Sequence, residues 1–295
     1  MSRISYIELG GTLFIPATHK DLTAVATANK YPELKSLLID TEDGISQEDL
    51  VGALTKIKVL LQSLQRSNLL IFLRPRDEKV LATLLDFEGI EKIDGFILPK
   101  FSLHNANNYL SLLENTSFDF MPSIEGEELF NIYKLYQLKE LLLTYKEQII
   151  LIRFGLEDMQ KALKIKREPF ESIFDKAALS QVVANLILTF KPDGFALSAG
   201  VYKYFNNKEG FEKEIYREFS EGLFSKTIIH PKQIKPLNKL NMPSQKEYED
   251  ALEILNTQSA VFNQNGAMAE KNTMSVFAQE IVLRKKIFGV NIFKQ

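Results

Sequence analysis

The chain has 295 residues, 45% of them hydrophobic and 25% charged, a composition that excludes a disordered protein and allows a sizeable core. Its 36 basic and 38 acidic residues leave a formal net charge of −2, which gives no electrostatic reason to expect nucleic acid or an anionic membrane as a partner. Cysteine is absent, which excludes disulfides, thiolate nucleophiles, iron–sulfur clusters and cysteine-based zinc sites.

Eight short apolar segments recur along the chain, separated by longer ones. They are residues 12–16, 36–40, 69–74, 94–99, 119–125, 148–154, 193–198 and 226–230. Continuous apolar runs of this length are typical of strands that are covered on both faces, so they predict a parallel sheet.

The intervening segments have helical periodicity. Residues 49–64 carry apolar side chains at positions 50, 54, 57, 61 and 64, which share one helical face. Residues 129–143 show a similar pattern, and residues 170–190 are long enough for a helix that follows Pro169. Eight strands alternating with helices favour a (β/α)8 TIM barrel of the α/β class over an open sheet.

The chain continues beyond the eighth segment. Residues 244–262 predict a helix, with Ser244 as its N-cap and Glu247 completing a capping box. A turn with the sequence NQNGAM and a last helix over residues 273–288 follow. We therefore expect a catalytic barrel over residues 1–240 and a C-terminal helical extension or lid over residues 241–295.

The chain begins MSRISYIELGG, without a charged leader followed by an apolar run. Its longest apolar stretches, such as residues 149–152, are far too short to span a bilayer. We expect a cytoplasmic protein that contacts neither a membrane nor nucleic acid.

Charged side chains gather where the predicted strands end, which is where barrel enzymes place their sites. In chain order they are Asp40, Glu42, Asp43, Arg74, Lys100, Glu125, Arg153, Glu157, Asp158 and His230. Solvated loops alone would explain any one of these residues, but their recurrence at one end of the barrel favours a site.

A metal here would depend on carboxylates, because the chain has only three histidines (His19, His104 and His230). Carboxylate ligands favour Mg²⁺, Mn²⁺ or Ca²⁺. Glu125 and Asp158 follow adjacent strands and could converge on one ion, leaving coordination positions for water and substrate. The alternative is a pair of solvated loop acids.

Arg74 lies directly at a strand end, where its planar guanidinium could bind a carboxylate or stabilise the oxygen of an enolate. The alternative is a salt bridge to Asp40 or Asp43, and both can hold because a neighbouring acid would orient the arginine. Lys100 could form an imine only with a strongly depressed pKa, and the nearby carboxylates predict the opposite shift.

We therefore assign Lys100 an electrostatic or structural role. We interpret His230 as a structural histidine, and Lys226, which begins a strand, receives no catalytic role. The sequence contains no P-loop, no GxGxxG that opens a helix after a strand and no GxSxG elbow, so nucleotide chemistry and serine hydrolysis lack their usual motifs.

At these same positions the chain resembles the citrate lyase beta-subunit-like carbon–carbon lyases, relatives of the HpcH/HpaI aldolases and malyl-coenzyme A lyases. The motifs that carry the resemblance are, in order, FIPATH, LLIDTEDGI, FLRPRD, IDGFILPKF, PSIEGEELF, RFGLEDM, KTIIHPKQI and NGAMAE. The PATH, RPRD and LPKF forms are most similar to the branch associated with tellurite-resistance gene clusters. Each motif is short, but eight in register over residues 10–289 are specific.

The resemblance implies a TIM barrel that binds Mg²⁺ (or Mn²⁺) through Glu125 and Asp158, with Arg74 at the substrate's carboxylate and carbonyl. A supporting acidic cluster would be formed by Asp40, Glu42 and Asp43. The reaction would be a reversible aldol or Claisen cleavage of a small keto or hydroxy acid, in which metal and arginine stabilise an enolate. Family members often form trimers or hexamers, so a homo-oligomer is expected.

Several departures from the family pattern concern coenzyme A. Residues 8–10 occupy the stretch where the coenzyme A lyases carry a basic residue, and residues 16–19 replace a small-residue P-G-N turn. Glu270 replaces an Asp of the C-terminal lid, and Ser225-Lys226 replaces Gly-Lys. These departures count against coenzyme A as a cofactor and against citryl-coenzyme A as the substrate, while Glu270 remains a candidate acid or base.

Three hypotheses follow. The first is a metal-dependent carbon–carbon lyase that acts on a small 2-oxo or hydroxy acid or its coenzyme A ester. The second is a non-catalytic barrel that binds a metabolite or a partner protein, and the third is a thioesterase that hydrolyses a coenzyme A ester.

Overall fold

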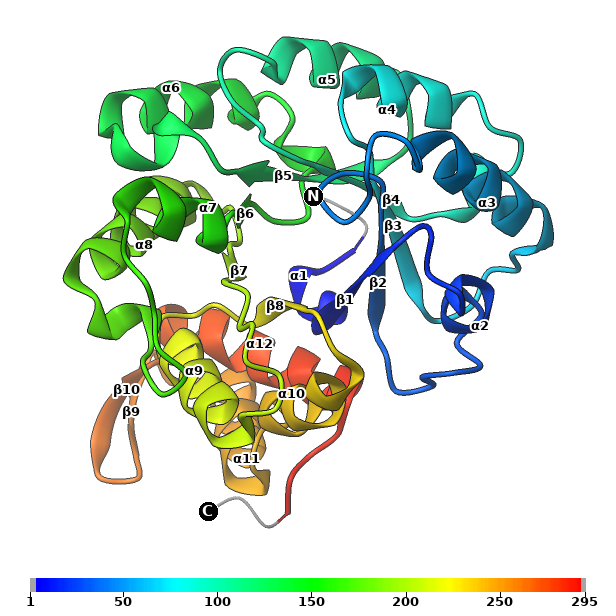
Figure 1. The fold of residues 1–295 in the computed structure, drawn as a ribbon. Helices are drawn as coiled ribbons and strands as arrows, with labels where there is room; N and C mark the ends of the chain where they lie inside the picture. The colour runs from blue at the N-terminus through cyan, green and yellow to red at the C-terminus, as the bar shows by residue number, and fades with distance from the viewer. Residues whose placement is uncertain (1–3, 293–295) are drawn as a thin grey trace. The chain divides into compact units, whose positions relative to one another are not determined.

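Two compact units, Met1–Ile234 and Lys235–Gln295, divide the chain. The computed structural model describes residues 4–292 (Figure 1). Within these residues, no helix combines the length and the apolar character that a membrane span requires.

The first unit contains an eight-stranded parallel sheet. Its strands are β1 (Gly11–Pro16), β2 (Ser36–Asp40), β3 (Leu70–Arg74), β4 (Gly95–Leu98), β5 (Asp119–Ile124), β6 (Arg153–Phe154), β7 (Ser198–Ala199) and β8 (Ser225–Ile228), in the order β6-β5-β4-β3-β2-β1-β8-β7. A parallel bridge between Ile152 and Leu197 joins the two edges and closes the sheet into a barrel. The predicted α/β TIM barrel is confirmed.

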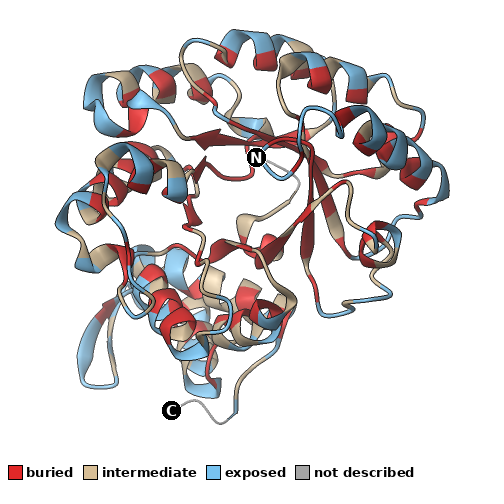
Figure 2. Cartoon of the chain, in the orientation of Figure 1, coloured by how far each residue is buried: buried red, intermediate tan, exposed pale blue. Residues whose placement is uncertain are grey.

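The short helix α1 (Tyr6–Leu9) lies within the ring of strands, and the later helices of this unit lie outside it (Figure 1). The outer helices are α2 (Leu22–Ala26), α3 (Leu50–Ser63), α4 (Glu78–Leu85), α5 (Ala106–Leu113), α6 (Ile132–Leu143), α7 (Leu156–Leu163), α8 (Ala177–Phe190) and α9 (Lys208–Ser220). Figure 2 shows the strands buried and the outer sides of these helices exposed, as expected where helices cover a parallel sheet.

The helix predicted over residues 170–190 starts later than expected, at Ala177. A separate 3-10 turn, Ile173–Asp175, precedes it and is closed by a capping box between Ser172 and Asp175. The side chains of both residues satisfy main-chain N–H groups within this turn, so the local hydrogen bonds favour a short turn over one continuous helix.

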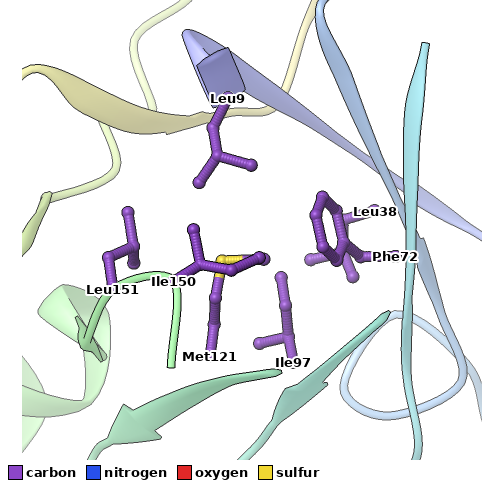
Figure 3. Packing of buried hydrophobic residues seen from close by; sticks show 7 residues of the cluster. All are labelled: Leu9, Leu38, Phe72, Ile97, Met121, Ile150 and Leu151. Atoms are coloured by element: carbon purple, nitrogen blue, oxygen red, sulfur yellow. The ribbon is translucent and has the colours of Figure 1, made fainter. Parts of the chain in front are cut away.

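Apolar side chains fill the inside of the barrel (Figure 3). They are Leu9, Leu38, Phe72, Ile97, Met121, Ile150 and Leu151. Because side chains alternate along a strand, the residue two positions after each of Leu38, Phe72, Met121 and Leu151 faces the same interior. Those residues are Asp40, Arg74, Ser123 and Arg153, so the apolar interior gives way to polar side chains toward the carboxyl ends of the strands.

The second unit is helical with one hairpin. After α10 (Ile234–Asn241), α11 (Gln245–Asn256) and α12 (Lys271–Phe288) pack through a small core that includes Ala251, Ile254 and Ala278. The helix predicted over residues 244–262 is wrong beyond Asn256, because β9 (Val261–Gln264) pairs antiparallel with β10 (Ala267–Glu270). Asn265 and Gly266 connect them with φ angles of 53° and 82°, as a two-residue Asn-Gly hairpin turn requires.

Two buried acidic side chains of α9, Glu214 and Glu218, accept hydrogen bonds from basic side chains. Lys226 Nζ donates to Glu218 Oε1 at 2.5 Å and also to the carbonyl of Gly200, while Arg167 Nη1 donates to Glu214 Oε1 at 2.5 Å. Burial raises the pKa of Glu218 to about 8, although the charge of Lys226 opposes this shift. The pairs support the structural reading of Lys226.

We expect Glu218 to make stability fall as pH rises from about 5 to about 8. In this window Glu218 holds a proton in the folded state, where its pKa is about 8. In the unfolded chain a glutamate has a pKa of about 4.3 and has already lost its proton. The stabilisation that proton binding at Glu218 contributes is therefore fully present below the pKa of the unfolded glutamate, and it is lost as pH rises through the pKa of Glu218 in the folded protein. Urea unfolding at several pH values should show a shallower slope of stability against pH for Glu218→Gln than for the native protein, and equal slopes would contradict the assignment.

Candidate functional site

The carboxyl ends of neighbouring strands carry the polar side chains of the candidate site. Asp40 ends β2, Arg74 ends β3, Lys100 follows β4 and Glu125 follows β5. Asp158 lies in the first turn of α7, which begins directly after β6 and Gly155. The barrel topology thus brings together residues that are up to 118 positions apart, from Asp40 to Asp158.

Arg74 lies between two buried carboxylates. Its Nε donates to Asp40 Oδ1 at 2.5 Å, its Nη2 lies 3.2 Å from Glu42 Oε2, and its guanidinium stacks over the ring of Phe14 at 5.1 Å. Burial alone would lower the pKa of Arg74, but the hydrogen bond to Asp40 and the charges of Asp40, Glu42 and Glu125 raise it overall. Arg74 is therefore a fixed, permanently charged group with one face held by acids.

The acidic loop after β2 is itself held in shape. Asp40 accepts N–H bonds from Glu42 at 3.1 Å and from Gly44 at 2.8 Å. Arg76 donates to the carbonyls of Thr41 and Glu42, each at 3.2 Å. These bonds tie the loop to the end of β3, so Asp40 and Glu42 orient Arg74 from a preorganised backbone.

Lys100 neutralises the outer part of this loop. Its ammonium contacts Glu42 Oε1 and lies 2.9 Å from Asp43 Oδ1, so Asp43 pairs with Lys100 instead of Arg74. Burial would lower the pKa of Lys100, but these two carboxylates raise it well above its ordinary value. A raised pKa counts against an imine-forming role, and the two ion pairs agree with the electrostatic role expected from the sequence.

Glu125 and Asp158 meet at Gly155. A Cβ atom placed on Gly155 would lie 2.6 Å from Glu125 Cγ and 3.2 Å from Asp158 Oδ2, so only glycine leaves room for both carboxylates. Burial raises the pKa of Glu125, and the charge of Asp158 adds to this shift, while Ser123 and Arg74 oppose it. Glu125 Oε2 is buried without a hydrogen-bond partner.

These features fit a hard divalent cation. A cation between the two carboxylates would satisfy the orphaned Glu125 Oε2 and offset the repulsion that raises its pKa. Among residues 4–292, no group of three or more His, Asp or Glu side chains is placed to hold a metal. The remaining coordination positions would therefore fall to water and to substrate oxygens, as is common for Mg²⁺.

A pocket of about 570 Å³ opens beside these carboxylates. Its lining adds side chains that the sequence did not single out, namely Ser102, Leu103, His104, Glu127, Glu128 and Lys134. They lie in the loops after β4 and β5 and in α6, a few residues beyond the strand ends. Glu127 and Glu128 fall within the motif PSIEGEELF, whereas the signal for the others was position after a strand, which weakens with each further residue.

Three other predicted positions lie elsewhere. His230 accepts the N–H of Lys232 at 3.1 Å and stacks on Phe205 at 4.3 Å, which agrees with a structural histidine. Lys226 belongs to the buried pair with Glu218. Glu270 belongs to the second unit, where it precedes α12 and accepts a bond from Thr273 Oγ1 at 3.1 Å; its role as acid or base stays a prediction.

Comparison with solved structures shows the same fold in proteins of low sequence identity. A citrate lyase from Burkholderia xenovorans LB400 is 16% identical, with a TM-score of 0.76 that covers 96% of this chain and 93% of that one. The CitE protein of Mycobacterium tuberculosis, solved in complex with magnesium, acetoacetate and coenzyme A, is 17% identical, with a TM-score of 0.67 over 95% of this chain and 99% of that one.

Sequence comparison places the chain among known enzymes. It is 29% identical to the citrate lyase subunit beta of Haemophilus influenzae over 143 residues, which are 48% of this chain and 46% of that one. It is 22% identical to a (3S)-malyl-CoA thioesterase of Cereibacter sphaeroides over 233 residues, which are 78% of this chain and 75% of that one. Residues 3–290 match the family described as carbon–carbon bond lyases of the TIM-barrel fold, and the chain belongs to that family.

Proposed function

We propose that this protein is a Mg²⁺-dependent lyase that breaks a carbon–carbon bond in a small 2-oxo or hydroxy acid. The observation that carries the proposal is the pair Glu125 and Asp158 around Gly155, with an unpartnered buried carboxylate oxygen. Arg74 acts on the same pair, since its charge opposes the rise in the pKa of Glu125 that burial causes.

Glu125 and Asp158 would hold the cation, which when bound would polarise the substrate's carbonyl group. Arg74 would bind the substrate carboxylate and stabilise the negative charge that develops on the carbonyl oxygen as the bond breaks. Asp40 and Glu42 keep the guanidinium oriented for this task, and Lys100 keeps the acidic loop in place. The hydroxyl proton of the leaving fragment needs a base, for which Glu270 is the candidate.

Complexes of structural neighbours are consistent with this substrate class. Mycobacterium tuberculosis proteins of this fold have been solved with magnesium and pyruvate, and with magnesium and oxaloacetate. By the same reasoning we propose Mg²⁺ (or Mn²⁺) as the cofactor of this chain and a keto or hydroxy acid as its ligand. A cytoplasmic homo-oligomer, a trimer or hexamer, remains part of the proposal.

A second candidate function is hydrolysis of a coenzyme A ester. It is favoured by the match to the malyl-CoA thioesterase, which covers more of this chain than the match to the citrate lyase subunit does. The departures from the coenzyme A lyase pattern at residues 8–10, 16–19 and 225–226 argue against it. Thioester consumption without carbon–carbon cleavage would identify this activity.

Mg²⁺-dependent binding of pyruvate tests the proposed site directly. We expect calorimetry to show that Glu125→Gln and Asp158→Asn each weaken Mg²⁺ binding by at least about 10- to 100-fold, the loss typical of residues that only orient a metal ligand, because each change removes an anionic ligand itself. Glu127→Gln is the matched control, since Glu127 lines the same pocket but is 72% exposed and pairs with Lys134. Unchanged binding in the first two variants, or no binding by the native protein, would overturn the proposal.

Turnover is tested by a panel of retro-aldol assays that follow release of pyruvate, acetyl-coenzyme A or glyoxylate. Sustained metal-dependent release by the native protein would separate a lyase from a barrel that only binds a metabolite. Release by Glu125→Gln at the native rate would show that the assayed activity does not use this site.

A further inference from the structure

Arg153 is a buried cation without an acidic partner. It is 4% exposed, and its two terminal nitrogens donate only to hydroxyls, Nη1 to Thr227 Oγ1 at 2.8 Å and Nη2 to Thr12 Oγ1 at 2.9 Å. Its Nε is buried with no hydrogen-bond partner. Among residues 4–292, no carboxylate forms an ion pair with it, although a buried guanidinium normally requires one.

The side chain of Arg153 crosses the inside of the barrel. It starts on β6 and reaches β8 and β1, passing β7, which is the neighbour of β6 in the closed barrel. It lies two positions after Leu151, whose side chain belongs to the interior cluster (Figure 3). Its charge therefore lies inside the barrel, on the carboxyl-end side of Leu151. The charge of Arg74 is close enough to repel it.

Several hydroxyl side chains share the inner face of the sheet with this cation. Thr12 pairs in register with Ser36 and with Thr227, Ser198 pairs with Ser225, and Ser123 pairs with Arg153 itself. Residues paired across parallel strands point to the same side of the sheet, so these hydroxyls face the interior with Arg153. Barrel interiors are usually filled by bulky branched side chains, so these hydroxyls give the inner face near Arg153 a polar lining.

The other cation of the barrel interior is already compensated. Arg74 is paired with Asp40 and Glu42, whereas Arg153 has only neutral hydroxyls. An anion brought to the barrel mouth would therefore gain more from Arg153 than from Arg74. The guanidinium can also donate from its unused Nε, which points to a ligand group that accepts hydrogen bonds and carries negative charge.

We propose that Arg153 binds a second anionic group of the substrate, so that the substrate is a dianion such as a 2-oxo dicarboxylate. This inference rests on the proposed function, because the first carboxylate and the carbonyl group are assigned to Arg74 and to the cation at Glu125 and Asp158. Arg153 acts as the specificity residue that separates dicarboxylates from monocarboxylates. It anchors the end of the substrate that does not react.

Matched pairs of 2-oxo acids test the proposal by calorimetry in the presence of Mg²⁺. The pairs are 2-oxopentanoate with 2-oxoglutarate and 2-oxobutanoate with freshly prepared oxaloacetate, each with the same carbon chain without and with a second carboxylate. In at least one pair, the native protein should bind the dianion about ten- to hundredfold more tightly, the range expected of a hydrogen-bonded charged contact. Arg153→Met should abolish that preference while leaving affinity for the monoanion within about threefold.

Two control variants keep the test decisive. Arg153→Lys keeps the charge and should keep part of the preference, and Arg66→Met makes the chemically identical change at an exposed arginine that donates to the carbonyl of Glu91. The melting temperature of ligand-free Arg153→Met should not fall, because the change removes a buried charge that has no counter-ion. If Arg153→Met does not fold, a smaller preference for the dianion in Arg153→Lys than in Arg66→Met replaces it as the supporting result, and equal preferences in the two variants overturn the inference.

The outcomes separate this inference from the proposed function. No preference in either pair, or the same preference in Arg153→Met as in the native protein, overturns the role of Arg153 while monoanion binding leaves the metal site standing. A lower melting temperature with the preference intact assigns Arg153 to structure and also overturns the inference. Failure of the native protein to bind any of the four acids with Mg²⁺ overturns the proposed function itself.

Discussion

Replacing Arg74 by methionine is expected to lower kcat/KM for carbon–carbon cleavage by about 10²- to 10³-fold, the usual cost of removing a preorganised group that stabilises an oxyanion. Methionine keeps much of the side-chain length but donates no hydrogen bond. The Mg²⁺ ligands are untouched by this change. The loss should therefore appear in steady-state kinetics at saturating Mg²⁺.

The same change should destabilise the fold. Asp40 is fully buried and loses its charged partner, whereas Glu42 keeps its ion pair with Lys100. Leaving a buried acid such as Asp40 unpaired costs about 3–5 kcal/mol of unfolding free energy. A second change, Asp40→Asn, should recover part of the stability in urea unfolding without recovering activity, which separates folding from catalysis.

Arg76→Met is the matched control for Arg74. Arg76 lies two positions further along the chain and bonds to main-chain carbonyls of the acidic loop, with no acidic partner among the bonds that hold it there. We expect a smaller loss of kcat/KM from this variant. Activity of Arg74→Met within tenfold of the native value, or a larger loss from Arg76→Met, would show that Arg74 does not stabilise the reacting oxygen.

Replacing Gly155 by alanine is expected to reduce turnover by about 100-fold, although no charge and no ligand is removed. The added methyl would lie 2.6 Å from Glu125 Cγ and 3.2 Å from Asp158 Oδ2, so at least one carboxylate must move. Displacement of a reacting group by about 1 Å can cost two orders of magnitude in rate. The backbone at Gly155, with φ −83° and ψ 92°, is not in the left-handed region, so the effect comes from the contact and not from strain.

Gly52→Ala provides the control for this variant. Gly52 lies within α3, and a Cβ there would meet nothing within 4 Å. Alanine at an exposed helix interior should stabilise the protein by about 0.5–1 kcal/mol and leave turnover unchanged. Native Mg²⁺ affinity and turnover in Gly155→Ala would contradict the assignment of Glu125 and Asp158 as a converging pair.

The fold was largely predictable because its signal is local and repeated. Ser36–Asp40 is a strand with the predicted bounds, and the helix predicted over residues 49–64 is α3 (Leu50–Ser63). The errors occur where local hydrogen bonds compete with periodicity. Ser172 and Asp175 close a separate turn ahead of α8, and the Asn265-Gly266 turn forms a hairpin in a stretch expected to be helix and loop.

The candidate site was predictable only in part. Asp40, Arg74 and Glu125 were found because each lies at or next to a strand end. The sequence did not predict which acid pairs with which base, and Asp43 is the partner of Lys100. Arg153 was noted as the end of a strand, but its lack of an acidic partner depends on side chains from β1 and β8, far away in sequence.

By itself, the sequence determined the barrel, its family and the strand ends at which charged groups gather, since these depend on residue type, spacing and order along the chain. Tertiary structure alone decided which of those groups meet. Closure of the barrel brings Glu125 and Asp158 together beside Gly155 and turns Arg153 inward, where burial makes a missing counter-ion costly. Contacts of this kind depend on distances between strands that are remote in sequence, and periodicity carries no information about such distances.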